Sequence, residues 1–167
     1  MDKYKNVVFL DYDGVVNTLM WNEEGTKTGY NFPSDEKVNN FQACQWVSQF
    51  CEKKDYVIVV TSTWRKNNKY ELCLRQGGLR DDVIVYDVTP ILEDKSRADE
   101  IIQWLKEHPW VENYVIFDDE NCGYSKPGCP LGCHLVSCNR TVGVTFDEYM
   151  YACGMHDHGD SMRERNI

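Results

Sequence analysis

The sequence predicts a single α/β domain built around a buried parallel sheet of about five strands, and three observations lead to this fold class. Short runs of β-branched and aromatic residues, apolar on both faces, recur along the chain, as is typical of strands buried in a parallel sheet. Amphipathic helical patterns alternate with these runs, which favours helices on both faces of the sheet. The length of 167 residues suits one domain with its own core.

Four apolar runs predict strands, and a shorter run predicts a fifth. They cover residues 7–10, 57–60, 83–86, 114–117 and 135–136. Each is four residues or fewer and is bounded by polar or turn-forming residues, which favours strands over buried helices. The expected architecture is therefore three-layered, with a central parallel sheet and right-handed crossovers.

Three helices are predicted between and after these strands. One has the apolar face Ala98, Ile101, Ile102 and Leu105, with Ser96 as its N-cap. A longer helix is expected from about Ser34, capped by Ser34 or Asp35, with Val38, Phe41, Val47 and Phe50 on its apolar face. Thr145 opens a short final helix. Residues 1–153 are expected to form the domain, and residues 154–167 a polar, loose tail.

Composition and charge narrow the classes of function. No apolar run is long enough to cross a bilayer, and the N-terminus lacks the apolar segment of a signal peptide. We therefore expect a cytoplasmic protein without a membrane partner. A formal net charge of −9 opposes non-specific binding to nucleic acid. Nucleic acid is accordingly expected only as a substrate.

Acidic and hydroxyl side chains follow three of the predicted strands. Asp11, Thr61 and Asp118 each come directly after an apolar run, and ligands of open parallel sheets bind at the carboxyl ends of the strands. Asp13 follows Asp11 at a distance of two residues, and Gly14 permits a sharp turn. Paired carboxylates repel unless a cation or a proton separates them, so the pair suits Mg²⁺. The alternative is a capping Asp followed by an ordinary Asp-Gly turn.

The stretch from Asp11 to Val15 resembles the Asp-x-Asp-x-[Thr/Val] signature of the haloacid dehalogenase (HAD) superfamily. Further stretches resemble its other motifs in order and spacing: Thr61 with Ser62 the second, the helix beginning near Arg97 the third, and Asp118 with Asp119 the fourth. The resemblance covers nearly the whole chain and implies a Rossmann-like HAD fold. The pairs Trp64-Arg65 and Trp104-Leu105, together with Gly143-Val144-Thr145, narrow it to the HAD domains of RNA-repair proteins and their stand-alone relatives.

The resemblance implies a role for each site residue. Asp11 is the expected nucleophile, and Asp13 is the expected general acid and base, which also reaches the metal through its backbone carbonyl. Thr61, through its hydroxyl and backbone N–H, is expected to bind the phosphoryl group, with Ser62 and Lys95 as further substrate-binding residues. Arg97 is the preferred basic residue of the third motif and Lys95 the alternative. The implied metal set is Asp11, Asp13, Asp118 and Asp119 around Mg²⁺.

The connections between the motifs are too short for a folded cap domain. An open site of this kind suits a bulky phosphorylated substrate. Trp21, Tyr30 and Phe32 precede the first long helix and either stack on a base of the substrate or pack on the domain. The expected function is a Mg²⁺-dependent phosphatase acting on nucleic-acid ends or nucleotides. The alternatives are a protein or small-metabolite phosphatase and a catalytically silent interaction domain. The sequence predicts no oligomeric state.

The chain has eight cysteines. In a cytosolic protein free thiols are the first interpretation. Four cysteines and one histidine fall close together: Cys122, Cys129, Cys133, His134 and Cys138. Their spacing departs from the paired Cys-x₂₋₄-Cys pattern of structural zinc sites, which favours a Gly/Pro-rich loop with incidental thiols over zinc.

Overall fold

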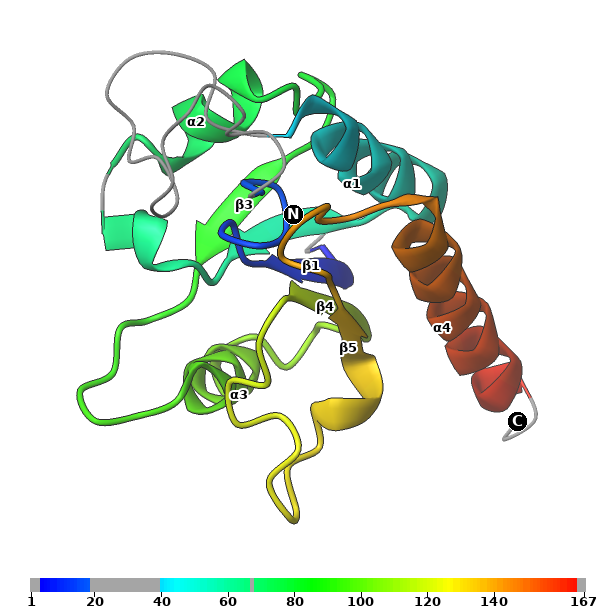
Figure 1. Cartoon of the computed structure of the whole chain (residues 1–167). Coiled ribbons are helices and arrows are strands. Elements are labelled where there is room, and N and C mark those ends of the chain that lie inside the picture. The colour runs from blue at the N-terminus through cyan, green and yellow to red at the C-terminus, as the bar shows by residue number, and fades with distance from the viewer. Residues whose placement is uncertain (1–3, 19–39, 67, 165–167) are drawn as a thin grey trace.

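The computed structural model describes residues 4–18, 40–66 and 68–164 and has the expected α/β architecture (Figure 1). Five parallel strands form one sheet in the order β3-β2-β1-β4-β5. Their bounds are β1 Asn6–Leu10, β2 Val57–Val60, β3 Val85–Val88, β4 Asn113–Asp118 and β5 Leu135–Ser137. The order places β1 at the centre, paired on one side with β2 and on the other with β4.

Helices cover both faces of the sheet. Helices α1 (Phe41–Lys54) and α4 (Phe146–Glu164) pack against each other over one face, and α3 (Arg97–Glu107) covers the other (Figure 1). The alternation of side chains along β1 divides the core accordingly, because Val8 and Leu10 belong to the cluster of α1 and α4. Val7 and Phe9 belong to the cluster of α3. The short helix α2 (Tyr70–Gln76) and β3 fill the connection from residue 65 to residue 95.

Helix α1 begins later than the apolar pattern predicts. Its N-cap is Asn40, whose side chain accepts hydrogen bonds from the backbone N–H groups of Gln42 and Ala43 at 3.1 and 3.2 Å. The amide of Asn40 also donates to the carbonyl of Val142 at 3.1 Å, so a distant loop fixes the cap. Phe41, expected on the buried face, is 56% exposed. The expected caps Ser34 and Asp35, and Val38, lie outside the described residues.

Two further boundaries differ from the prediction. Strand β3 is formed by Val85–Val88 rather than by residues 83–86, because pairing with β2 begins at Ile58 and continues past an irregularity to Val88. Helix α4 continues to Glu164, through residues expected to form a loose tail. Of the helices in the described part of the chain, none combines the length and apolar character that a membrane span needs.

A buried ion pair connects the carboxyl-terminal edge of the sheet to α3. The guanidinium of Arg65 donates to Glu100 of α3 at 2.6 Å, and both side chains are less than 10% exposed. The same guanidinium donates to the carbonyls of Thr61, of Ser62 at 2.7 Å and of Thr89 at 3.0 Å. Arg65 therefore holds the segments that follow β2 and β3 in fixed positions relative to α3.

Removal of the Arg65 side chain is expected to destabilise the fold strongly. Arg65→Met leaves Glu100 buried without its cation, which should lower the free energy of unfolding by about 3–5 kcal/mol. Urea denaturation measures this loss. Lys5→Met is the matched control, because Lys5 and Glu112 form an ion pair at 2.7 Å with side chains 64% and 46% exposed. It should cost less than about 1 kcal/mol. Equal losses in the two variants would contradict the structural role given to Arg65.

Candidate active site

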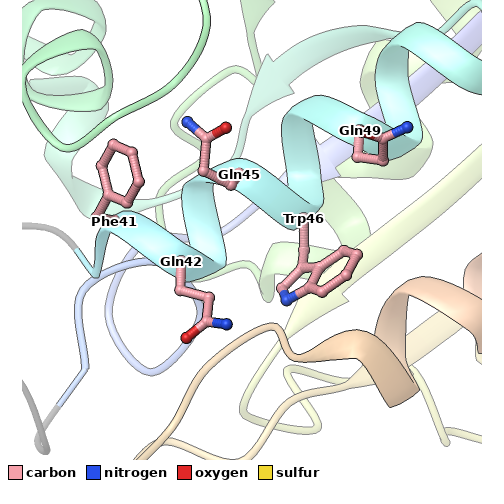
Figure 2. Close-up of a pocket in the computed structure, with 5 residues that line it drawn as sticks. All are labelled: Phe41, Gln42, Gln45, Trp46 and Gln49. Atoms are coloured by element: carbon pink, nitrogen blue, oxygen red, sulfur yellow. The ribbon is translucent and has the colours of Figure 1, made fainter.

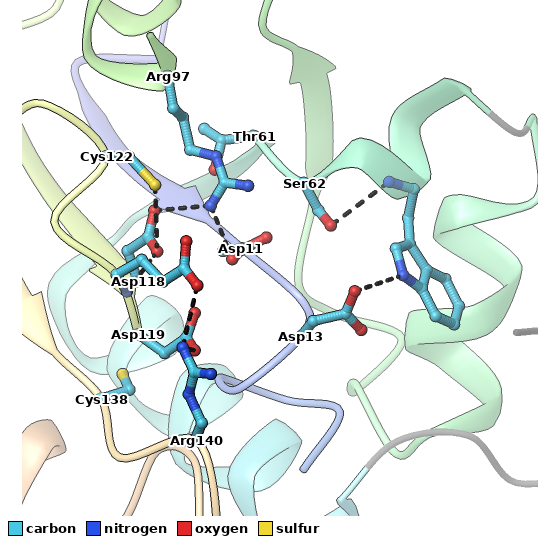
Figure 3. A network of polar contacts seen from close by, with 12 residues as sticks. Asp11, Asp13, Thr61, Ser62, Arg97, Asp118, Asp119, Cys122, Cys138 and Arg140 are labelled. Carbon is cyan, nitrogen blue, oxygen red and sulfur yellow. Dashed lines mark hydrogen bonds and ion pairs between the residues drawn. The ribbon is translucent and has the colours of Figure 1, made fainter. Parts of the chain in front are cut away.

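The carboxyl ends of the three central strands bring Asp11, Thr61 and Asp118 to one edge of the sheet (Figure 3). Asp11 follows β1, Thr61 follows β2, and Asp118 is the last residue of β4. Backbone hydrogen bonds extend the ladders into the site: the N–H of Asp11 donates to the carbonyl of Phe117 at 3.1 Å, and that of Thr61 to Leu10 at 2.9 Å. The strand register therefore fixes the positions of the nucleophile candidate and its neighbours.

Three carboxylates gather at this edge. Oxygen atoms of Asp11, Asp118 and Asp119 all lie within 4.8 Å of one another. Asp11 is 4% exposed and Asp118 is fully buried, so water screens their mutual repulsion little. An arrangement of this kind needs positive charge close by.

Arg97 supplies part of that charge. Its Nη1 atom lies 2.7 Å from Oδ2 of Asp11 and 2.7 Å from Oδ2 of Asp118. Arg97 is the first residue of α3, which is capped by Ser96 in a capping box with Asp99. The cap fixes the start of the helix, and so directs the Arg97 side chain to the carboxylates. Lys95, the alternative basic residue, is exposed.

Further groups hold the fourth-motif carboxylates in place. Asp118 accepts hydrogen bonds from the Tyr124 hydroxyl at 2.9 Å and from the Glu120 N–H at 3.0 Å. Arg140, from the loop after β5, lies 3.1 Å from Asp119. Neither Tyr124 nor Arg140 was predicted from the sequence, because both belong to loops without a recognisable spacing relative to the motifs.

The carboxylates remain incompletely compensated. Burial, followed by the charge of Asp118, raises the pKa of Asp11 to about 6 against the opposing effect of Arg97. Burial and Asp118 likewise raise the pKa of Asp119, with Arg140 opposing. An additional cation would stabilise the ionised forms of both groups. A set of carboxylate oxygens without sulfur or nitrogen ligands is the donor set that Mg²⁺ prefers, so these residues fit the expected ion.

The Thr61 hydroxyl points to a ligand at the same edge. Thr61 is fully buried, and its Oγ1 atom has no hydrogen-bond partner in the described structure. A buried hydroxyl without a partner is costly, so an oxygen-bearing ligand would satisfy it. The backbone N–H of Thr61, expected as a second contact to the phosphoryl group, donates to the carbonyl of Leu10 at 2.9 Å.

Asp13 lies apart from the other carboxylates. Figure 3 shows its side chain turned away from Asp11, Asp118 and Asp119. Its two oxygens accept hydrogen bonds from Asn17 Nδ2 at 2.8 Å and from Trp64 Nε1 at 3.1 Å. Burial raises the pKa of Asp13, while these two hydrogen bonds and Arg97 lower it. The Asp13 carboxylate is therefore engaged outside the carboxylate cluster, and the metal contact expected through the Asp13 backbone carbonyl stays a prediction.

The cysteine-rich segment does not converge on a shared site within the described residues. His134 stacks on Tyr114 at 4.0 Å, and its Nδ1 atom bonds to the Tyr114 carbonyl at 3.0 Å. Cys133 is exposed, Cys138 is buried, and Cys122 lies beside Asp118 with 3.9 Å between Sγ and the carboxylate. Cys122 therefore borders the carboxylate cluster through its contact with Asp118.

A separate cavity of about 470 Å³ lies on the surface of α1 (Figure 2). It is lined by Phe41, Gln42, Gln45, Trp46 and Gln49. None of these side chains is ionisable, and none belongs to the motif residues at the sheet edge. The motif side chains therefore gather at the carboxyl ends of the strands, not in this cavity.

Comparison with known proteins agrees with this arrangement. The family described as the HAD domain in Swiss Army Knife RNA repair proteins matches residues 7–148, which include every motif residue of the site. No curated protein matches the chain.

Gly14 allows the turn after β1 to approach the fourth motif. Its φ angle is +78°, and a Cβ atom on it would lie 2.4 Å from Cγ of Asp119. We expect Gly14→Ala to strain the backbone and displace Asp119, at a cost of about 1–3 kcal/mol in the free energy of unfolding. Gly128→Ala is the control, since Gly128 has φ +80° but open space around its Cβ position. Urea denaturation compares the two. A loss in Gly14→Ala no larger than in Gly128→Ala would show that the contact with Asp119 does not matter.

Proposed function

The chain belongs to the family of HAD domains found in Swiss Army Knife RNA repair proteins, and from this membership we propose that it is a Mg²⁺-dependent phosphomonoester hydrolase with an aspartyl-phosphate intermediate on Asp11. Domains of this family are usually hydrolases, and HAD proteins generally use Mg²⁺. The observation that carries the proposal is the cluster of Asp11, Asp118 and Asp119, in which the Arg97 guanidinium contacts Asp11 and Asp118.

The charges at the site favour a phosphate monoester as substrate. Asp11, Asp118 and Asp119 contribute three negative charges when ionised, and Arg97 and Arg140 contribute two positive ones. Glu120, which also pairs with Arg140 at 3.0 Å, adds a fourth negative charge, so a divalent cation brings the sum to zero and removes the repulsion that a phosphate dianion would otherwise meet. Mg²⁺ would be held by the three carboxylates and the backbone carbonyl of Asp13, and when bound it would neutralise charge on the phosphoryl oxygens.

The side chains divide the reaction between them. A carboxylate oxygen of Asp11 attacks phosphorus, which splits the hydrolysis into two easier steps. Asp13 gives a proton to the departing ester oxygen and later takes one from the attacking water. The Thr61 hydroxyl, which lacks a hydrogen-bond partner among the described residues, would donate to a phosphoryl oxygen. Arg97, already 2.7 Å from Asp11, offsets the negative charge that builds up as the bond to phosphorus forms.

The substrate class we propose is the phosphorylated end of a nucleic acid or a nucleotide. The support is the family description, which names RNA repair proteins, together with the absence of a second folded domain over the site among the described residues. An open site suits the end of a polymer. A panel of 5′- and 3′-phosphorylated oligonucleotides, nucleotides and sugar phosphates tests this choice. Preference for sugar phosphates or phosphopeptides would replace it with the metabolite or protein alternative.

The nucleophile can be tested with a generic aryl phosphate. The wild-type protein is expected to hydrolyse p-nitrophenyl phosphate with Mg²⁺ and to lose this activity in EDTA. Asp11→Asn should lower turnover by more than about 10³-fold, because an amide cannot form the acyl-phosphate. Asp82→Asn is the control, as Asp82 is exposed, pairs with Arg80 at 2.6 Å and lies outside the carboxylate cluster. Near-normal turnover of Asp11→Asn, or full activity in EDTA, would rule out the mechanism. A wild-type protein without hydrolytic activity would favour the interaction-domain alternative.

Replacement of Arg97 and replacement of Lys95 are expected to have different effects on kcat/KM. Arg97→Met should reduce kcat/KM by about 10²–10³-fold, because it removes a cation that contacts the nucleophile. Lys95→Met should change kcat/KM by less than about threefold, since an exposed lysine is strongly screened by solvent. Steady-state kinetics of both variants provides the comparison. If Lys95→Met loses more activity than Arg97→Met, the two roles must be exchanged.

A further inference from the structure

The carboxyl group of Asp13 is held at both oxygens. Oδ1 accepts the Asn17 amide at 2.8 Å, and Oδ2 accepts the indole N–H of Trp64 at 3.1 Å. These donors come from the turn after β1 and from the short 3₁₀ helix η2 (Thr63–Lys66) after β2. Because the two bonds approach different oxygens, rotation of the carboxyl group breaks at least one of them.

Both donors are themselves fixed. Trp64 is 7% exposed, and its ring packs on Tyr12 with 5.5 Å between centroids. The Tyr12 hydroxyl donates to the carbonyl of Tyr70 in α2 at 2.7 Å. Asn17 is fully buried, with its backbone N–H bonded to the Tyr12 carbonyl at 2.8 Å. Neither donor can move toward another acceptor without disrupting the packing around it.

We propose that Trp64, together with Asn17, is a positioning residue that aims the Asp13 carboxyl group at the leaving oxygen of the substrate. The inference rests on the proposed phosphatase function and adds to it a group that sets which leaving groups the enzyme tolerates. No chemical role was expected for Trp64 from the sequence alone. Its position beside Asp13 results from the fold, which brings residues 13 and 64 together from two neighbouring strand ends.

The first chemical step shows what such positioning does. An oxygen of Asp11 forms a bond to phosphorus while the bond between phosphorus and the ester oxygen breaks. The electron pair of the broken bond stays on the ester oxygen, which takes the proton from the Asp13 carboxyl group. A protonated carboxyl oxygen still accepts one N–H donor, so Trp64 and Asn17 can hold Asp13 before and after the transfer. Afterwards their N–H groups stabilise the carboxylate that remains.

The need for this proton depends on the leaving group. An alkoxide is a strong base and leaves slowly unless it is protonated. A p-nitrophenolate is a weak base and leaves without a proton. Loss of the Trp64 hydrogen bond should therefore slow the hydrolysis of an alkyl phosphate much more than that of p-nitrophenyl phosphate. Since kcat/KM reports the steps up to the first phosphoryl transfer, it is the constant to compare.

The decisive experiment measures kcat/KM of wild-type protein and Trp64→Phe on both esters with Mg²⁺. We expect Trp64→Phe to lose at least about tenfold more on the alkyl phosphate, because general acid catalysis contributes about 10²–10⁴-fold when the acid is well placed. KM should change little, since the indole does not bind phosphate. Asn17→Ala removes the second donor to the same carboxyl group and should show the same selectivity, so it tests the inference even if Trp64→Phe does not fold.

Trp104→Phe is the matched control. Trp104 is also a buried tryptophan, 1% exposed, and its indole donates to Asp87 at 2.7 Å, in α3 and away from the carboxylate cluster. It should lose stability but keep the wild-type ratio between the two esters. Equal losses on both esters in Trp64→Phe and Asn17→Ala would overturn the positioning role and leave the phosphatase function standing. Hydrolysis of neither ester by the wild-type protein would instead reject the phosphatase function, and the role of Trp64 with it.

Discussion

Repulsion between buried carboxylates is the constraint around which the carboxyl-terminal edge of the sheet is organised. Asp11 directly follows β1 and Asp118 ends the adjacent strand β4, and the hydrogen bonds between these segments fix the positions of the two residues. In water such a pair would separate, but here the backbone prevents it. The Arg97 guanidinium contacts both carboxylates and so lowers the free-energy cost of their repulsion. Arg97 is carried by α3, which is held in place by its capping box and by the Arg65–Glu100 ion pair. The contacts that fix α3 and the loops after β2 and β3 thus also keep Arg97 beside the two carboxylates.

The end of β1 at Leu10 separates the two acids of the first motif into different environments. Asp11 continues the ladder and faces the cationic cluster, whereas the turn that begins after it directs the Asp13 side chain toward Trp64. Residues two positions apart in a strand would face the same side. Because the chain has already left the strand, one acid is surrounded by charges and the other by neutral N–H donors. Two chemically identical carboxyl groups thereby have different surroundings, which suits them to different chemical roles.

The central strands and the motif residues could be predicted because their signals are local. A buried parallel strand requires an apolar run, and its carboxyl end requires a polar ligand-binding residue, so the sheet edge with Asp11, Thr61 and Asp118 followed from the sequence. The HAD family and its three-layer fold are confirmed by the match over residues 7–148. Arg97 was favoured over Lys95 by spacing, and the structure gives it the contacts with Asp11 and Asp118.

The remaining features depend on contacts between distant segments. The start of α1 is fixed by Asn40, which bonds to Val142, and an apolar pattern around Phe41 does not contain that information. Strand β3 pairs on one side only, so its bounds follow its neighbour rather than its own hydrophobicity. The orientation of Asp13 depends on Trp64, which lies 51 residues away in the sequence. Such positions require the tertiary structure.

The short edge strands of the sheet affect how readily the protein pairs with other chains in a concentrated solution. Its outermost strands are β3, with four residues, and β5, with three. A strand at the border of a sheet presents unpaired amide and carbonyl groups that can recruit another chain. A border this short presents few of them, and on β3 the acidic Asp87 interrupts the apolar run. The two ends of the sheet therefore offer little template for strand exchange or aggregation, even though the strands between them are among the most apolar segments of the chain.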